Sequence, residues 1–368
     1  MATKCTFPPE SPELVYIPDM TEKSYVLILN WNGWQDTIEC LESVFRLEHP
    51  SFQVVVLDND SSDGSLDHIR AWADGALKVD ESGVNPKLTR LISPPVNKPI
   101  PYALLDKTQA EAGGGVDADE GKLILIQTGD NLGFAGGNNV GLRYIIKRGD
   151  YSYVWLLNND TVVEPGALSA LTRRVDDKKE YGICGSTVMH YHQPDQIQAL
   201  GGATYNKVLG RPKLFAPALP PERKLTTEEV ERRLDYVYGA SMLITRDWLS
   251  EIGLMSEDYF LYFEELDWIR EAKGRYIMAW AEASVVYHKR GVSIGINRDI
   301  RKRSYTCDYY YARNRLAFTR KHIPIYTPFI YLLLIMDIFR RIAKGQLERA
   351  WMILYLLLGI KESGDKHS

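Results

Sequence analysis

The sequence predicts an α/β fold in which a mostly parallel, Rossmann-like central sheet is flanked by helices and followed by a C-terminal helical extension. Short apolar runs alternate with segments of helical periodicity through the first 160 residues. Strands that alternate with helices form parallel sheets with right-handed crossovers. Each apolar run also ends in amides and carboxylates, and the last quarter of the chain is rich in basic and apolar residues.

Four buried strands carry the prediction. They are expected at residues 25–30, 53–57, 122–127 and 153–157, where apolar runs are bounded by polar residues. Helices are expected from a cap at Asp36 to about Leu47, from Ser65 onward, and from the glycine-rich segment 131–139 to about Lys147. This alternation predicts a parallel sheet with crossover helices for the first half of the chain.

Residues 74–121 interrupt the pattern. They contain several prolines, acidic residues and the run Gly113–Gly115. We expect a surface insertion that is disordered or a hairpin, with at most one short strand at residues 88–92, because long proline-rich loops rarely form core elements.

Composition narrows the class of protein. The 368 residues have a net charge of −4, so nothing global indicates a nucleic-acid partner. The four cysteines lack metal-ligand spacing, which favours a reducing compartment over a disulfide framework. Residues 1–23 have no apolar signal segment and are expected to form a flexible arm. A cytoplasmic location follows as an expectation.

The polar residues after the four strands indicate a ligand site. Any one cluster is ordinary turn chemistry, but four clusters at the same edge of a parallel sheet favour a bound nucleotide. Carboxylate and amide oxygens are the ligands that Mg²⁺ or Mn²⁺ prefers. Asp58 can accept a hydrogen bond from a pyrimidine or a ribose, and the backbone of residues 133–137 can approach a ligand closely. The fingerprints of dinucleotide-binding and P-loop proteins are absent from the sequence.

Four segments together resemble the family 2 glycosyltransferases, and most closely their rhamnosyltransferase-like branch. They are Val26–Gly33, Val55–Ser65, Asn131–Gly141 and Leu156–Thr161. The resemblance covers roughly residues 24–320 apart from the insertion. It implies a GT-A fold, a nucleotide-diphosphate sugar donor (dTDP-rhamnose first, a UDP-sugar second), a divalent cation, and inversion at the anomeric carbon.

The resemblance also assigns site residues. Asn158-Asn159-Asp160 stands at the metal motif, where Asn158 replaces the first carboxylate and leaves Asp160 as the charged ligand. His288 stands where the family often has a histidine that binds the metal or the diphosphate. Arg313 lies in a recurring family segment and is either a diphosphate ligand or part of a solvated helix face. The residues expected to contact the donor are Asn30, Asn32, Asp58, Asn59, Asp63, Asn131, Gly133, Phe134, Gly137, Asn138, Asn158, Asn159 and Arg313.

Three acids after an aromatic run, Glu264, Glu265 and Asp267, supply the candidates for a general base. Acids at a helix start are also ordinary compensation of the helix dipole. The block resembles the family's acidic motif, in which Glu265 takes the position of the base, where Asp is usual. Glu264 and Asp267 are the next candidates, for base or acceptor binding. The preceding segment 236–244 either admits sugar and acceptor or packs closely against a neighbouring strand.

The C-terminal region is expected to meet a membrane or another subunit. Residues 323–339 and 350–360 are apolar but too short to span, since a spanning helix needs about 20 apolar residues. Basic residues between them favour peripheral contact with an anionic membrane through residues 323–360, and a homodimer interface is the alternative.

The sequence therefore predicts a GT-A domain at residues 24–296 and an extension at 297–368. Residues 24–160 form the expected nucleotide-binding half and 161–296 the acceptor half. The expected activity is metal-dependent transfer of a sugar, with rhamnose favoured, to a hydroxyl of a cell-surface glycan or lipid-linked acceptor at the inner face of the membrane. A sugar nucleotidyltransferase is disfavoured because residues 30–34 lack Lys and Arg. A non-catalytic scaffold stays open because Glu265 replaces the usual Asp.

Overall fold

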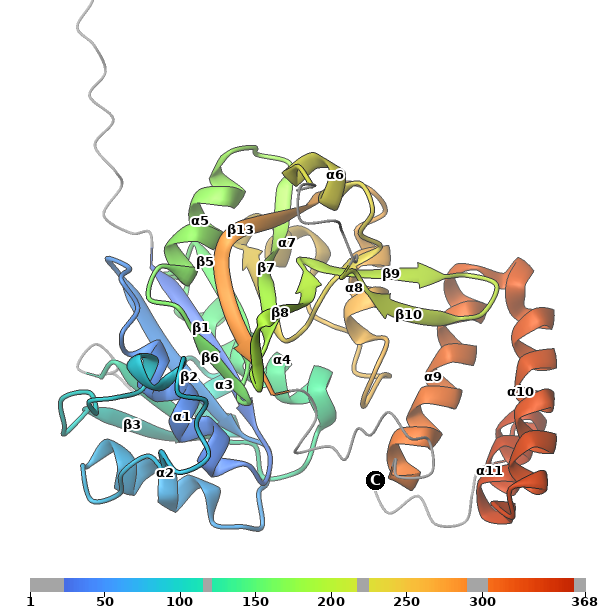
Figure 1. The fold of residues 1–368 in the computed structure, drawn as a ribbon, viewed down its shortest axis with the longest axis horizontal. Helices are drawn as coiled ribbons and strands as arrows, with labels where there is room; N and C mark the ends of the chain where they lie inside the picture. The colour runs from blue at the N-terminus through green and yellow to red at the C-terminus, as the bar shows by residue number, and fades with distance from the viewer. Residues whose placement is uncertain (1–22, 115–120, 217–224, 290–303, 361–368) are drawn as a thin grey trace, which may run out of the picture.

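A computed structural model describes residues 23–114, 121–216, 225–289 and 304–360, and it confirms the predicted α/β architecture (Figure 1). A ten-stranded sheet has the strand order β3-β4-β2-β1-β5-β12-β7-β13-β6, with β8 paired to β7. Its strands are β1 Ser24–Asn30, β2 Phe52–Asp58, β3 Tyr102–Asp106, β4 Leu123–Gln127, β5 Tyr153–Asn158, β6 Thr161–Val163, β7 Tyr181–His190, β8 Gln193–Leu200, β12 Ser241–Thr245 and β13 Ile277–His288.

The sheet is mixed. β1 pairs in parallel with β2 and β5, and β2, β4 and β3 continue the parallel part. β12 runs antiparallel to both β5 and β7, whereas β13 returns parallel to β7. A second sheet contains β9 Gly202–Asn206, β10 Arg211–Leu214 and β11 Tyr236–Val237. Since β5 and β12 are hydrogen-bonded, the main sheet runs unbroken from the first half of the chain into the second.

Helices cover both faces of the sheet because alternate strand residues point to opposite sides. Val26 and Val54 pack in one apolar cluster with α1 Trp34–Val44, α2 Ser65–Ala73 and α5 Ala167–Asp176. Leu27 and Val55 pack in another with α4 Gly133–Arg148, α7 Arg246–Ile252 and α8 Glu264–Glu271. The remaining helices of the main body are the short α3 Lys107–Glu111 and α6 Thr227–Glu231.

Helix α1 begins before the predicted cap. Its first residue is Trp34, so Asp36 lies in the first turn and does not cap the helix. The carboxylate of Asp36 instead pairs with Lys289 from the end of β13. This correction has a physical cause, since an acid in a first helical turn is favourable without being the cap.

The insertion is ordered over residues 74–114, so the prediction of a disordered loop or hairpin was wrong for that part; residues 115–120 lie outside the described chain. β3 adds an edge strand parallel to β4. The strand predicted at 88–92 is a short 3₁₀ helix, Thr89–Leu91. Leu88, Leu91 and Ile92 are buried together, and their spacing of three and four residues is helical, not alternating.

Three further helices follow the sheet: α9 Tyr305–His322, α10 Thr327–Ala343 and α11 Leu347–Leu358 (Figure 1). A 3₁₀ turn, Pro324–Tyr326, links α9 to α10. Ile330 and Leu334 of α10 form an apolar cluster with Leu316 of α9 and Ile353 of α11. Within the described ranges, every helix is too short or too polar to cross a membrane. The predicted N-terminal arm lies outside the described residues except for Lys23.

Candidate active site

Three of the four predicted polar strand ends, those of β1, β2 and β5, meet at one edge of the sheet. Asn30 at the end of β1 is fully buried and donates to Asp58 Oδ1 at the end of β2, at 2.8 Å. Its own side-chain oxygen accepts from Thr37 at 2.8 Å and from Asn159 at 3.4 Å. Asn30 therefore orients the other side chains at this edge.

The loops after β1 and β2 are hydrogen-bonded to each other. Asn32 has φ 50° and accepts through Oδ1 from the backbone N–H of Ser62 at 2.8 Å. Its own backbone N–H donates to Ser61 Oγ at 2.9 Å. Asp63 accepts from the backbone N–H of Ser65 at 3.0 Å and from its hydroxyl, so its carboxylate serves the start of α2. The expectation that Asp63 contacts a donor has no support from this arrangement.

The glycine-rich segment forms the first turns of α4, as expected of a segment that opens a helix. Gly133 has φ +70°, and a Cβ there would lie 2.2 Å from the carbonyl oxygen of Phe260. A Cβ on Gly137 would lie 2.6 Å from Leu29. These glycines let the helix pack closely on β1 and on the segment before α8.

The other donor candidates of this segment are engaged locally. Asn131 accepts from Asn59 Nδ2 at 2.9 Å, and Asn138 donates to the carbonyl of Phe134 at 2.9 Å. Phe134 is partly buried and packs against the apolar cluster under α4. Contact of these residues with a nucleotide stays a prediction.

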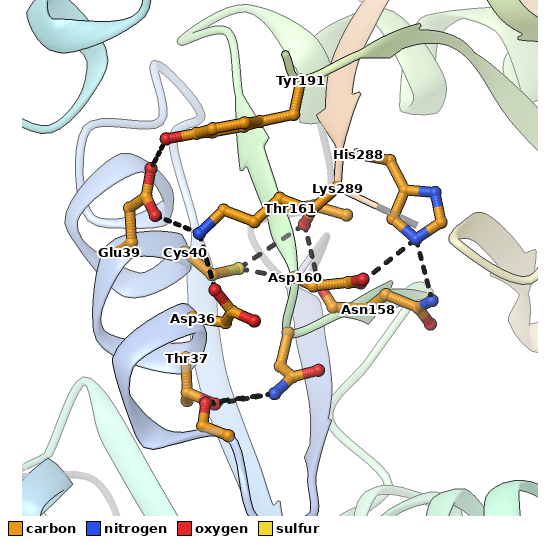
Figure 2. A network of polar contacts seen from close by, with 12 residues as sticks. Asp36, Thr37, Glu39, Cys40, Asn158, Asp160, Thr161, Tyr191, His288 and Lys289 are labelled. Carbon is orange, nitrogen blue, oxygen red and sulfur yellow. Dashed lines mark hydrogen bonds and ion pairs between the residues drawn. The ribbon is translucent and has the colours of Figure 1, made fainter. Parts of the chain in front are cut away.

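Asp160 and His288 form a buried pair, and Figure 2 shows them facing each other. His288 Nε2 lies 3.1 Å from Asp160 Oδ1 and 3.5 Å from Asn158 Nδ2. The pairing follows from the topology, because β13 runs antiparallel to β6 with His288 opposite Thr161. Two predicted metal residues, 128 positions apart in the sequence, thus come together.

Gln198 of β8 sets the orientation of the imidazole. Its Oε1 lies 2.7 Å from His288 Nδ1, and its Nε2 donates to the His288 carbonyl at 3.2 Å. An acceptor at Nδ1 requires the proton there, which leaves the Nε2 lone pair directed at Asp160 in the neutral ring. A histidine fixed in this way by an outer partner is typical of metal ligands. The residues present therefore fit a divalent cation.

Lys289 fixes the end of β13 on α1 (Figure 2). Its ammonium is 2.6 Å from Asp36 Oδ1 and also contacts Glu39, which accepts from the hydroxyl of Tyr191. Its backbone N–H donates to the carbonyl of Asp160 at 3.0 Å. Burial lowers the pKa of Lys289, but the two carboxylates outweigh it and raise the pKa above its ordinary value. Lys289 thereby holds His288 beside Asp160.

The three predicted acids at the start of α8 have different environments. Glu264 is buried and Glu265 is half-buried. Burial and the nearby Glu265 carboxylate raise the pKa of Glu264 well above its usual range. Burial raises the pKa of Glu265 to about 7, against hydrogen bonds from the backbone at Gly239. Asp267 instead binds His322 at 2.7 Å and Lys321 at 3.0 Å, which lower its pKa against the effect of burial.

One short segment connects the acids to the metal pair. The hydroxyl of Tyr238 lies 3.4 Å from His288 Nδ1, and the carbonyl of Ala240 accepts from the backbone N–H of Asn158 at 3.1 Å. Between them, a Cβ on Gly239 would lie 2.3 Å from Glu265 Oε1. The glycine therefore makes room for the Glu265 carboxylate. Residues 238–240 bring Glu265 and the Asp160–His288 pair to one site.

Arg313 and a cluster of Asp267, Glu271 and His322 take no part in the contacts just described for Glu265, Asp160 and His288. Arg313 donates to the carbonyl of Asp258 at 2.8 Å and to Asn314 Oδ1 at 2.7 Å, so its guanidinium serves the protein fold. The ligand atoms of Asp267, Glu271 and His322 lie within 4.8 Å of one another. The ammonium of Lys321 already contacts both carboxylates, at 3.0 and 2.9 Å, and neutralises this cluster.

Sequence reasoning missed Gln198, Lys289 and Glu39. Gln198 lies in a polar strand with no motif, and its role depends on a partner 90 residues away. Lys289 carried a usable signal, since it directly follows the candidate ligand His288.

Known proteins resemble this chain in sequence and in fold. A family model described as glycosyl transferase family 2 matches residues 25–90 and 105–253, more than half of the chain. A low-salt glycan biosynthesis hexosyltransferase, Agl10, of Haloferax volcanii is 26% identical over 148 residues, which are 40% of this chain and 45% of that protein. An N-acetylglucosaminyl-diphospho-decaprenol L-rhamnosyltransferase of Mycobacterium tuberculosis is 25% identical over 187 residues, 46% of this chain and 60% of that protein. The chain thus spans about half the length of these relatives.

Among solved structures, a mannosyltransferase from Pyrobaculum calidifontis, in complex with GDP-Man and Mn²⁺, superposes with a TM-score of 0.46 at 13% identity. The superposition covers 92% of this chain and 76% of that one.

Proposed function

We propose that this chain, which belongs to glycosyl transferase family 2, transfers a sugar from a nucleotide sugar with inversion of configuration at the anomeric carbon. In this proposal Glu265 is the base, and Asp160 and His288 hold a divalent cation. The observation that carries this proposal is the segment 238–240, which contacts Glu265, His288 and the backbone of Asn158. The family match favours this activity over the alternatives of a nucleotidyltransferase and a non-catalytic scaffold.

The reaction is an in-line displacement. The Glu265 carboxylate accepts the proton of an acceptor hydroxyl, and the hydroxyl oxygen forms a bond to the anomeric carbon. The bond from that carbon to the diphosphate oxygen breaks on the opposite face, and the nucleoside diphosphate leaves with the electron pair. A bound Mg²⁺ or Mn²⁺ stabilises the charge on the leaving diphosphate. A base with a pKa of about 7 is half ionised at neutral pH, where general-base catalysis is most efficient.

Glu264 has a different role in this proposal. Burial and the neighbouring Glu265 carboxylate raise its pKa well above the usual range, which makes Glu264 the weaker candidate for the base. Its buried Oε2 has no hydrogen-bond partner among the described residues. A buried oxygen without a partner is costly unless a ligand supplies one. We assign Glu264 to an acceptor hydroxyl.

Rhamnose from dTDP-rhamnose is the favoured donor sugar, and a UDP-sugar is second. The named activity of the Mycobacterium tuberculosis relative supports rhamnose, although the hexosyltransferase of Haloferax volcanii leaves other sugars open. A thermal-shift panel of dTDP-rhamnose, UDP-GlcNAc and GDP-mannose, each with and without Mn²⁺, tests this choice. A ligand at 100 times its dissociation constant adds about 2.7 kcal/mol of stability. Absence of any shift across the panel contradicts the proposed donor site.

The acceptor is a glycan or a lipid-linked sugar, and the C-terminal helices favour a membrane-bound one. Phe329, Leu332, Met336 and Phe339 recur every three or four residues on α10 and are all at least half exposed. Trp351 of α11 is equally exposed, and both helices lie on the side of the molecule away from the sheet (Figure 1). Aromatic and aliphatic side chains with basic neighbours are typical of helices that lie in a membrane surface. The exposed basic neighbours are Arg340 and Lys344.

Vesicle flotation tests the membrane contact on the cytoplasmic face. The parent protein should float with vesicles that contain anionic lipid, and Phe339→Glu should bind them at least tenfold more weakly, because a charge enters the apolar face. Val208→Glu is the control, because Val208 is an exposed apolar residue of the β9–β10 hairpin outside α10 and α11; this variant should float like the parent. If the parent does not float and sediments as a dimer that Phe339→Glu dissociates, the face is a homodimer interface.

A further inference from the structure

The chain enters α8 through a strained turn. Tyr262 and Phe263 have φ values of 69° and 76°, and Phe263 is the residue before the first helical residue, Glu264. Non-glycine residues in this left-handed region are strained, because the Cβ crowds the backbone. Two in succession persist only where the surroundings hold them. The turn matters because it sets where α8 begins and therefore where Glu265 lies.

Asn314 of α9 holds this turn from one side. The side chain is completely buried, and its Nδ2 donates to the carbonyls of Leu261 at 2.8 Å and Tyr262 at 3.1 Å. Its Oδ1 accepts from Arg313, which also donates to the carbonyl of Asp258. One amide therefore satisfies the carbonyls of two successive residues shortly before the acids.

Helix α4 holds the same segment from the other side. The backbone N–H of Phe134 donates to the carbonyl of Phe260 at 2.9 Å, an approach that Gly133 permits because it lacks a Cβ. Within α8, the backbone N–H of Asp267 donates to the carbonyl of Phe263 at 2.8 Å. The turn is thus held by three hydrogen-bond donors. Among them, the backbone N–H of Asp267 belongs to α8 itself and that of Phe134 reaches Phe260, before the strained residues. Asn314 is the donor from outside α8 that bonds to a strained residue, Tyr262.

We propose that Asn314 is a positioning residue: it holds the Tyr262–Phe263 turn and so places the Glu265 carboxylate against Gly239. This inference rests on the proposed role of Glu265 as base. It also gives the α9 segment a function other than diphosphate binding, since Arg313 fixes the Asn314 amide. The C-terminal extension thereby completes the site that the sheet begins.

The test compares Asn314→Ala with Asn139→Ala. Asn139 is a matched control, because it is also buried and donates through Nδ2 to two acceptors, Met255 and Glu257, upstream of the turn. The pKa of Glu265 is measured by NMR titration of protein labelled with ¹³C at the glutamate carboxyls, with the signal assigned from Glu265→Gln. Turnover is measured as release of nucleoside diphosphate from the donor that the thermal-shift panel identifies.

We expect Glu265 in Asn139→Ala to titrate as in the parent protein. In Asn314→Ala the relaxed turn should move the carboxylate toward solvent, so its pKa should fall by at least about one unit toward the ordinary value. Turnover should fall about 100-fold, because catalytic groups tolerate little displacement. Should Asn314→Ala fail to fold, Asn314→Ser keeps one hydroxyl donor in place of the amide and should shift the titration and the turnover in the same direction by a smaller amount.

An unchanged Glu265 titration in the Asn314 variant, with turnover no lower than in Asn139→Ala, would overturn the positioning role. This failure is distinct from failure of the proposed base. If Glu265→Gln retains turnover, the base is another group, while the titration still reports whether Asn314 places the Glu265 carboxylate.

Discussion

Replacing Glu265 by Gln should stabilise the protein at alkaline pH. Burial raises the pKa of Glu265 from its ordinary 4.5 to about 7, so the folded state binds a proton more tightly than the unfolded chain. The stability that this proton contributes is fully present below pH 4.5 and is lost as pH rises through 7. A neutral amide of the same shape removes that dependence.

The size of the effect follows from the shift. Each pKa unit corresponds to 1.36 kcal/mol, so the loss between pH 4.5 and 8 is at most about 3 kcal/mol, and less because the carboxylate is half-buried. The assay is urea unfolding of the parent and Glu265→Gln at pH 5 and pH 8. We expect the variant to gain about 1–3 kcal/mol relative to the parent on going from pH 5 to pH 8. An equal difference between the two proteins at both pH values refutes the assigned pKa.

Three other substitutions test separate parts of the structure. Lys289→Met should cost about 3 kcal/mol in urea unfolding, because two carboxylates on α1 lose their buried partner; a loss under 0.5 kcal/mol would mean that the pairing is solvated. His288→Ala should reduce the Mn²⁺-dependent part of the thermal shift by a nucleotide to zero, since the cation loses a ligand, and a preserved Mn²⁺ effect would place the metal elsewhere. Gly133→Ala should lower the free energy of unfolding by about 1–3 kcal/mol through its clash with Phe260, whereas a neutral result would contradict the close packing of α4 on that segment.

The parallel half of the sheet was predictable because its strands are buried on both faces. Continuous apolar runs such as Val54–Leu57 are typical of strands in this position, and the polar residues that follow them mark where each strand ends. β3 was not found, because Tyr102–Asp106 is short, partly exposed and preceded by prolines, so its strand conformation depends on pairing with β4. Local sequence does not encode that tertiary contact.

In the candidate site, the acidic residues could be found from the sequence, but the residues that orient them could not. Asp160 and Glu265 stand in recognisable motifs, whereas Gln198 and Asn314 act through single amides on partners distant in sequence. Gly133 and Gly137 of α4 permit close packing of the helix, a role that the sequence alone does not distinguish from close approach to a ligand. Asp267 was a reasonable base candidate until Lys321 and His322, 54 and 55 residues later, were found to pair with it.

In the proposed mechanism, Glu265 removes the acceptor proton and takes no part in binding the donor. The most direct measurement is a single-turnover assay of Glu265→Gln with the bound donor and Mn²⁺, together with the dissociation constant of that donor. We predict a dissociation constant within twofold of the parent and sugar transfer reduced by at least about 100-fold. Transfer at the parent rate by a variant that binds the donor normally would contradict the account.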